Sequence, residues 1–164
     1  MIESQEESRE KYDNGYYQDM LERGLKFQDV VTEALYHRGI IVVGYASREF
    51  QNKRGENMLG AEIKNDYKFR KTKRLFIEVA EKSHPNKPNY TPSGIMRRDN
   101  SWLFVIGDDK RFWVFTIKDI KRLLDTYQKV QTPTSIGHLM PLEDANKHAQ
   151  LKFLRRGEPD LACE

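Results

Sequence analysis

Two short apolar runs around a strongly basic turn constrain this chain more than any other stretch. Most of both runs lies in GAEIKNDYKFRKTKRLFIEVAEK, from residue 60 to residue 82. The runs at residues 58–65 and 74–81 contain apolar residues that favour β-strands. Each run nevertheless contains a carboxylate, Glu62 in the first and Glu78 in the second. The turn between them holds a cluster of cations, which are Lys68, Arg70, Lys71, Lys73 and Arg74. We therefore predict a hairpin that presents two acids beside a basic turn.

Glu62 would face Glu78 if these strands pair antiparallel about a turn centred near Arg70. Side chains alternate across a strand, so Glu62 shares a face with Lys64, and Glu78 shares one with Lys82. Two like charges about 4 Å apart repel by about 4 kcal/mol at an effective dielectric constant of about 20. A divalent cation between the carboxylates would relieve that repulsion. Alternatively, one or both acids lie on a solvated face and are neutralised by the nearby lysines and the basic turn.

The rest of the chain predicts helices packed on strands. Helices are predicted over residues 16–37, 117–130 and 142–154, and strands over residues 40–43, 58–65, 74–81, 101–108 and 111–117. Apolar residues recur at helical spacing in the first helix, which Gly39 ends, and Thr116 is placed to cap the second. These elements predict an α/β (α+β) fold, in which helices flank a mixed sheet of about five strands.

Length, charge and cysteine content limit the class of protein. A chain of 164 residues with a net charge of +3 fits one mildly basic domain, predicted at residues 15–164 after a disordered acidic segment at residues 1–14. The single cysteine, Cys163, excludes a disulfide framework within the chain and fits a reducing compartment. The N-terminus has no signal-peptide pattern and no stretch is long enough to span a bilayer, so we predict a cytoplasmic protein.

The segment GAEI, followed after a turn by LFIEVAEK, resembles the core of the PD-(D/E)xK nuclease superfamily, which has the restriction-endonuclease-like fold. The likeness extends to uncharacterised phage and bacterial members and to junction resolvases. It implies that Glu62, Glu78 and the Val79 carbonyl bind a metal ion. The lysine expected two residues after the second acid is replaced by Ala80, so Lys82 or Lys64 would have to supply the catalytic charge.

The same resemblance allows other assignments. In a second registration, Glu62-Ile63-Lys64 is itself the acid-spacer-lysine motif, with Glu49 or Glu56 as the upstream acid. We rank it below the first because Glu56 belongs to a polar loop. The helix before the motif has Gln28 where the superfamily often has an acid, so Gln28 is a further candidate.

The resemblance implies an enzyme, a Mg²⁺- or Mn²⁺-dependent deoxyribonuclease that hydrolyses phosphodiester bonds in DNA. The basic turn would contact nucleic-acid phosphates, and a homodimer is compatible with the superfamily. The alternative is a catalytically inactive protein of the same fold that binds nucleic acid or a protein partner. Ala80 favours this alternative, whereas the paired acids favour the nuclease.

Overall fold

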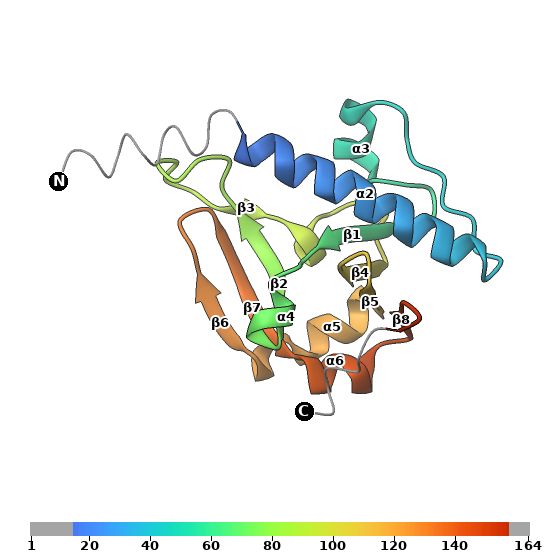
Figure 1. Cartoon of the computed structure of the whole chain (residues 1–164). Coiled ribbons are helices and arrows are strands. Elements are labelled where there is room, and N and C mark those ends of the chain that lie inside the picture. The colour runs from blue at the N-terminus through green and yellow to red at the C-terminus, as the bar shows by residue number, and fades with distance from the viewer. Residues whose placement is uncertain (1–14, 158–164) are drawn as a thin grey trace.

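The computed structural model describes residues 15–157 (Figure 1). Its helices are α2 (Tyr16–Tyr36), α3 (Arg48–Arg54), α4 (Phe69–Thr72), α5 (Ile117–Leu123) and α6 (Leu142–His148), with 3-10 helices η1 (Gly94–Met96) and η2 (Leu124–Thr126). Its strands are β1 (Ala61–Asn65), β2 (Arg74–Glu81), β3 (Thr91–Pro92), β4 (Leu103–Gly107), β5 (Arg111–Thr116), β6 (Gln128–Gln131), β7 (Ser135–Pro141) and β8 (Leu151–Leu154). The predicted mixture of helices and strands is confirmed. The expected disordered segment, residues 1–14, lies outside the described residues.

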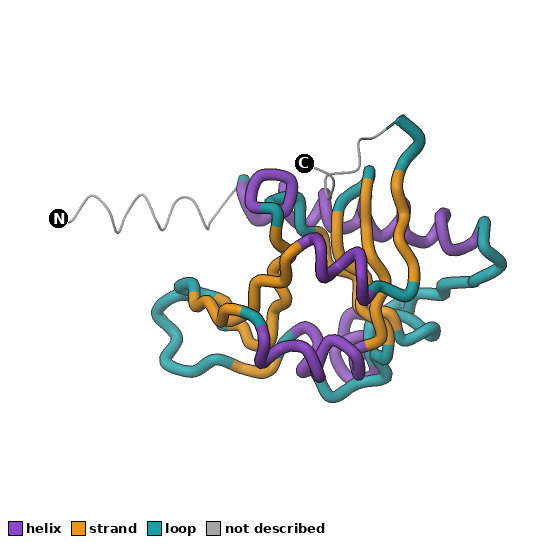
Figure 2. Tube along the Cα trace, turned by 90° about the horizontal axis from the view of Figure 1, so that it is seen from below, coloured by secondary structure: helices purple, strands orange, loops and turns teal. Residues whose placement is uncertain are grey.

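The strands form two four-stranded sheets, in the orders β1-β4-β5-β8 and β3-β2-β7-β6. In the first sheet, β1 is an edge strand that pairs parallel with β4, and the other neighbours are antiparallel. All pairs in the second sheet are antiparallel. Figure 2 shows the strands in two separate groups. The strands predicted for one sheet are thus divided, because the chain leaves the first sheet after β1 and returns to it at β4.

Helix α2 covers one face of the first sheet. Its buried side chains recur at helical spacing, at Phe27, Val31, Ala34 and Leu35. They pack against alternate residues of the strands beneath, which are Ala61, Ile63, Val105, Phe112 and Val114. Because side chains alternate along a strand, the neighbours of these residues must point to the other face of the sheet.

The second core lies on that other face, between the two sheets and against α5 and α6. The first sheet contributes Phe104, Ile106, Trp113 and Phe115, and the second contributes Leu75, Ile77 and Met140. The even-numbered residues of β1, Glu62 and Lys64, are turned toward this side as well. The fold therefore directs two charged side chains of an edge strand toward the seam between the sheets.

The predicted hairpin of residues 58–65 and 74–81 is wrong, because β1 and β2 belong to different sheets. The basic turn contains α4, which buries Phe69 completely. Arg70 forms an ion pair with Asp108 beyond β4. Asp66 accepts a hydrogen bond from the backbone N–H of Phe76 at 2.9 Å, which links the end of β1 to β2. These contacts replace the backbone ladder that a hairpin would have formed.

The β-branched run at residues 40–43 is not a strand. Ile41 and Val43 are 70% and 48% exposed, and the only pairing nearby is an isolated bridge between Gly44 and Asn57 within the described residues. The edge strand of the first sheet on this side is β1, and residues 40–43 do not pair with it. The predicted buried strand is therefore an extended segment beside α2.

The two C-terminal helices are shorter than predicted. The first begins as expected, with the Thr116 hydroxyl accepting from the backbone N–H of Asp119 at 3.1 Å. It then ends at Leu123, and β6 occupies residues 128–131. The last helix ends at His148, after which β8 pairs with β5. In both cases, residues that the sequence pattern predicts as helix pair as β-strands instead.

Candidate functional site

Glu62 is a buried carboxylate at the seam between the sheets. It pairs in register with Phe104 of β4, and its side chain is 1% exposed. Within the described residues, neither of its carboxylate oxygens accepts a hydrogen bond. Buried polar groups are nearly always hydrogen-bonded, and burying a charge without compensation is costly. Glu62 is therefore the strongest indication of a functional site in the molecule.

Two cations compensate for the charge of Glu62. The Lys64 ammonium lies 3.3 Å from Glu62 Oε1 and 3.9 Å from Glu78 Oε1, so one lysine bridges both acids. Burial alone would lower the pKa of Lys64, but the carboxylates of Glu62, Glu78 and Glu56 raise it above its ordinary value. On the other side, Arg97 Nη1 lies 3.7 Å from Glu62 Oε2.

Glu78 comes from the second sheet and is held by two hydroxyl groups. The Ser93 hydroxyl donates to Glu78 Oε1 at 2.6 Å, and the Ser135 hydroxyl donates to Glu78 Oε2 at 2.8 Å. The chain passes close by at Gly94, where an added Cβ would lie 2.5 Å from the carbonyl oxygen of Glu78. The two serine hydroxyls fix the direction of the Glu78 carboxylate. Because hydroxyl groups carry no charge, the carboxylate can still interact with a further cation.

Glu56 completes the acidic group. Its Oε2 is 3.5 Å from the backbone nitrogen of Ile63, which donates to it. Burial and the nearby Glu62 carboxylate raise the pKa of Glu56 to about 7. The second registration had Glu56 as the upstream acid before Glu62-Ile63-Lys64, and the structure brings these residues together. Glu49, the other candidate, is exposed on α3.

Several predicted residues are engaged elsewhere. The Lys82 ammonium donates to the carbonyl of Pro85 at 3.2 Å and lies 4.4 Å from the ring centre of Tyr90. The Val79 carbonyl, which is displaced by a bulge in β2, accepts from the backbone N–H of Ser93 at 3.0 Å. Gln28 is half-buried on α2. Of the two candidate lysines, only Lys64 contacts the acids.

The structure separates the five cations of the basic turn. Arg70 is committed to Asp108, whose side chain is 7% exposed. Lys71 and Lys73 are exposed on and just after α4. Lys68 and Arg74 line a cavity that also includes Lys64 and Glu78. Two of the five thus line the same cavity as Glu78.

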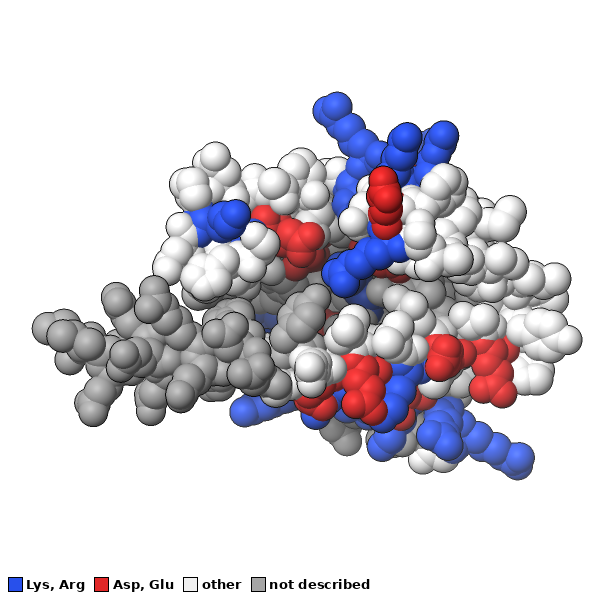
Figure 3. Space-filling view, turned by 90° about the horizontal axis from the view of Figure 1, so that it is seen from above, with Lys and Arg blue, Asp and Glu red and all other residues white. Residues whose placement is uncertain are grey.

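This cavity has a volume of about 510 Å³ and opens next to Glu78. Its walls come from the start of α2, the segment after β1, one face of β2 and the loop before β7. Figure 3 shows Lys and Arg side chains and Asp and Glu side chains close together around a hollow on the face seen from above. The volume falls within the range of about 300–1,000 Å³ that is typical of small-ligand sites.

The acids fit a hard divalent cation of the Mg²⁺ type. No group of three or more His, Cys, Asp or Glu side chains is arranged to hold a metal ion in residues 15–157. Mg²⁺, however, is usually held by one or two carboxylates together with water and substrate phosphate. Glu62, neither of whose oxygens accepts a hydrogen bond from the described residues, and Glu78, which shares Lys64 with it, supply such a pair. The two carboxylates match magnesium in donor type, and an ion held there would need further ligands besides them.

Sequence reasoning missed Ser93, Ser135 and the role of Arg97. Arg97 is positioned by Asp99, whose Oδ2 is 3.1 Å from Arg97 Nε. Each of these residues is distant in sequence from the acids it contacts, and none belongs to a recognisable motif. Only the alternation of charged and apolar residues in β1 pointed directly to the observed arrangement.

Comparisons with protein-family models, curated proteins and solved structures give no match to this chain. Among helices in the described part of the chain, none is long and apolar enough to cross a membrane.

Proposed function

We propose that this protein is a metal-dependent nuclease that hydrolyses phosphodiester bonds in DNA. The observation that carries the proposal is Glu62, buried, with neither oxygen hydrogen-bonded within the described residues and with Lys64 two residues further along the same strand face. An acid, one spacer and a lysine is the pattern of the PD-(D/E)xK superfamily. Glu78 supplies a second acid from the neighbouring sheet.

Each residue then has a distinct role. Glu62 and Glu78 would hold Mg²⁺ or Mn²⁺, which supplies Lewis acidity toward phosphate and a lowered pKa for bound water. Lys64, released from the carboxylates, would orient the attacking water or stabilise negative charge on the phosphate. Lys64 is preferred to Lys82 because Lys82 is already paired with Pro85 and Tyr90. The Val79 carbonyl is not needed, since it accepts from Ser93.

The decisive assay incubates the pure protein with plasmid, single-stranded and branched DNA, in Mg²⁺ or Mn²⁺ and then in EDTA. We expect cleavage that EDTA abolishes and that Glu62→Gln reduces at least about a hundredfold, since electrostatic groups of this kind contribute that much to rate. Glu49→Gln, an exposed acid on α3, is the matched control and should cleave normally. Cleavage by Glu62→Gln at the wild-type rate would refute the proposed site.

One observation favours a non-catalytic alternative. The Lys64 ammonium lies within 4 Å of both acids, so it compensates their charges without any metal ion. A protein of this kind would bind DNA or a protein partner through the same face. DNA binding without cleavage of any substrate, in either metal, would support this alternative. We also propose that the protein acts in the cytoplasm, with which its single cysteine is compatible.

A further inference from the structure

Three residues on one face of β2 have complementary chemistry. Arg74, Phe76 and Glu78 alternate with the buried Leu75 and Ile77, and all three line the cavity. Neighbours on one strand face are about 7 Å apart. A cation, an aromatic ring and the candidate metal-binding acid therefore follow one another along a single wall.

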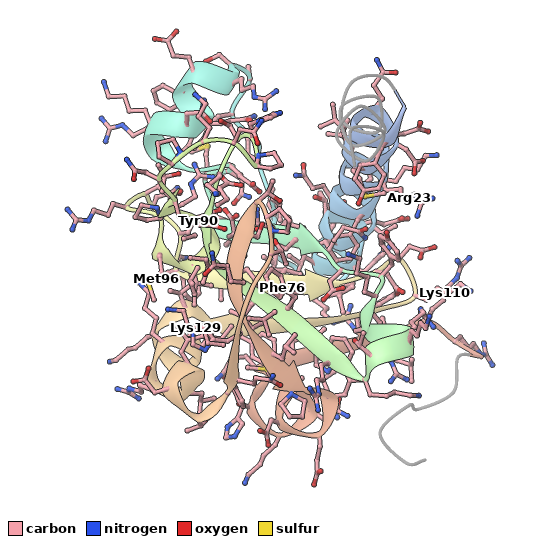
Figure 4. The ribbon with its side chains drawn as sticks, turned by 90° about the vertical axis from the view of Figure 1, so that its left-hand side faces the viewer. Arg23, Phe76, Tyr90, Met96, Lys110 and Lys129 are labelled. Atoms are coloured by element: carbon pink, nitrogen blue, oxygen red, sulfur yellow. The ribbon has the colours of Figure 1, made fainter. Side chains whose placement is uncertain are left out.

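The ring of Phe76 lies over the backbone of β7. A Cβ added at Gly137 would be 2.5 Å from Cζ and 2.6 Å from Cε2 of Phe76, so the ring occupies the space that any larger residue would fill. Gly137 is itself paired with Glu78. Figure 4 shows Phe76 in the middle of the view, between Arg23 on α2 and Tyr90 on the opposite side. Because the sheet supports the ring from one side, its half-buried remainder forms a platform at the cavity wall.

The rest of the cavity suits a nucleotide. Tyr16 and Tyr67 line it and are 47% and 37% exposed. Thr134 adds a hydroxyl group, whereas the hydroxyls of Thr132 and Ser135 are already hydrogen-bonded, to the Ser135 backbone and to Glu78. The cations in the wall are Lys64, Lys68 and Arg74, against the acids Asp66 and Glu78. Asp66 is already occupied, because it accepts from the backbone N–H groups of Lys68 at 3.0 Å and of Phe76 at 2.9 Å.

We propose that this cavity binds an unpaired nucleotide next to the scissile phosphate, so that the substrate is single-stranded DNA. In a duplex the faces of each base are covered by its neighbours, whereas an unpaired base is free to stack on an aromatic ring. Phe76 would stack the base, Arg74 and Lys68 would contact phosphate, and Glu78 would lie within about 7 Å of the stacked base. This assignment rests on the proposed function, because it names the substrate of the same site.

The test measures binding by fluorescence anisotropy in EDTA, with one short labelled DNA oligonucleotide in single-stranded and duplex form and single-stranded RNA of the same sequence. We expect the single strand to bind more tightly. Phe76→Leu, which keeps an apolar side chain but removes the π-face, should weaken single-strand binding about tenfold, near the lower end of the range for base–aromatic stacking. Tyr36→Leu, at a ring that is 66% exposed at the far end of α2, is the control and should change nothing.

Each other outcome overturns the inference. Equal affinity for both DNA forms, no binding, or tighter binding of single-stranded RNA would remove single-stranded DNA as the substrate. Unchanged single-strand binding by the Phe76→Leu variant would show that Phe76 does not stack a base. If Phe76→Leu lowers the melting temperature, the duplex affinity of the same preparation separates misfolding, which weakens both forms, from lost stacking. Because EDTA excludes metal, these results are independent of whether the protein cleaves DNA.

Discussion

Replacing Glu56 by glutamine should stabilise the protein at pH 8 and flatten its stability between pH 5 and pH 8. Burial, followed by the Glu62 carboxylate, raises the pKa of Glu56 from 4.5 to about 7 in the folded protein. Between these two values the folded state keeps a proton that the unfolded state releases. Stability from this group is therefore full below pH 4.5 and is lost as the pH rises to about 7.

The size of the effect follows from the difference between the two pKa values. One pKa unit corresponds to about 1.4 kcal/mol, so the rise from 4.5 to about 7 is worth at most about 3.5 kcal/mol. Glutamine keeps an oxygen that can accept from the backbone N–H of Ile63, as Glu56 does at 3.5 Å, and it carries no charge. The Glu56→Gln variant should lose the free-energy cost of ionising a buried carboxyl group and keep the hydrogen bond from the Ile63 backbone.

The assay is urea unfolding of the wild type and Glu56→Gln at pH 5 and pH 8. We expect the free energy of unfolding of the wild type to fall about 2–3 kcal/mol further than that of the variant over this interval. Glu49→Gln, on the exposed side of α3, should behave as the wild type does. Parallel pH dependence in the wild type and Glu56→Gln would show that Glu56 ionises normally and that the acidic group is more hydrated than its burial indicates.

Two further pairs of substitutions test the separate roles of the cations. Lys64→Met should reduce the initial rate of DNA cleavage in Mg²⁺ about a hundredfold or more. Lys82→Met should leave that rate within about threefold of wild type. The opposite order would return the catalytic role to Lys82. Arg70→Ala should lower the free energy of unfolding by about 1.5–3 kcal/mol, because it removes charge-assisted hydrogen bonds to the buried Asp108, which keeps the backbone N–H groups of Lys110 and Arg111. Lys71→Ala, at an exposed neighbour, should have little effect in the same denaturant titration. Equal effects would mean that the Arg70–Asp108 pair contributes nothing specific.

The sequence predicted elements wherever local pattern and tertiary pairing agree. The helix α2 and the strands β2, β4 and β5 follow their apolar spacing. The pattern failed where pairing between distant segments decided the structure. Among the described residues, the β-branched run at residues 40–43 belongs to no strand and has only an isolated bridge beside it, between Gly44 and Asn57. Residues 128–131 continue a helical pattern but pair with β7. Local sequence carries no information about these distant partners.

The candidate site shows the same contrast between what local sequence predicts and what tertiary pairing decides. Alternation in β1 correctly placed Glu62 and Lys64 on one face, and the two acids do share Lys64. The assumed hairpin was wrong because Asp66, α4 and Arg70 turn the chain into a second sheet, which the charges in the turn do not reveal. The serines that hold Glu78 were beyond prediction, since Ser135 lies 57 positions along the chain from it.

Because Glu62 belongs to one sheet and Glu78 to the other, the site exists only while the sheets remain docked. Proteins open locally at free energies below that of global unfolding. A small separation of the sheets would leave both backbone ladders intact yet draw the two carboxylates apart and admit water to Glu62. Ligand affinity would then fade at denaturant concentrations where secondary structure is still complete. A ligand that bridges Glu62 and Glu78 would hold the two sheets together and raise the denaturant concentration at which they first separate.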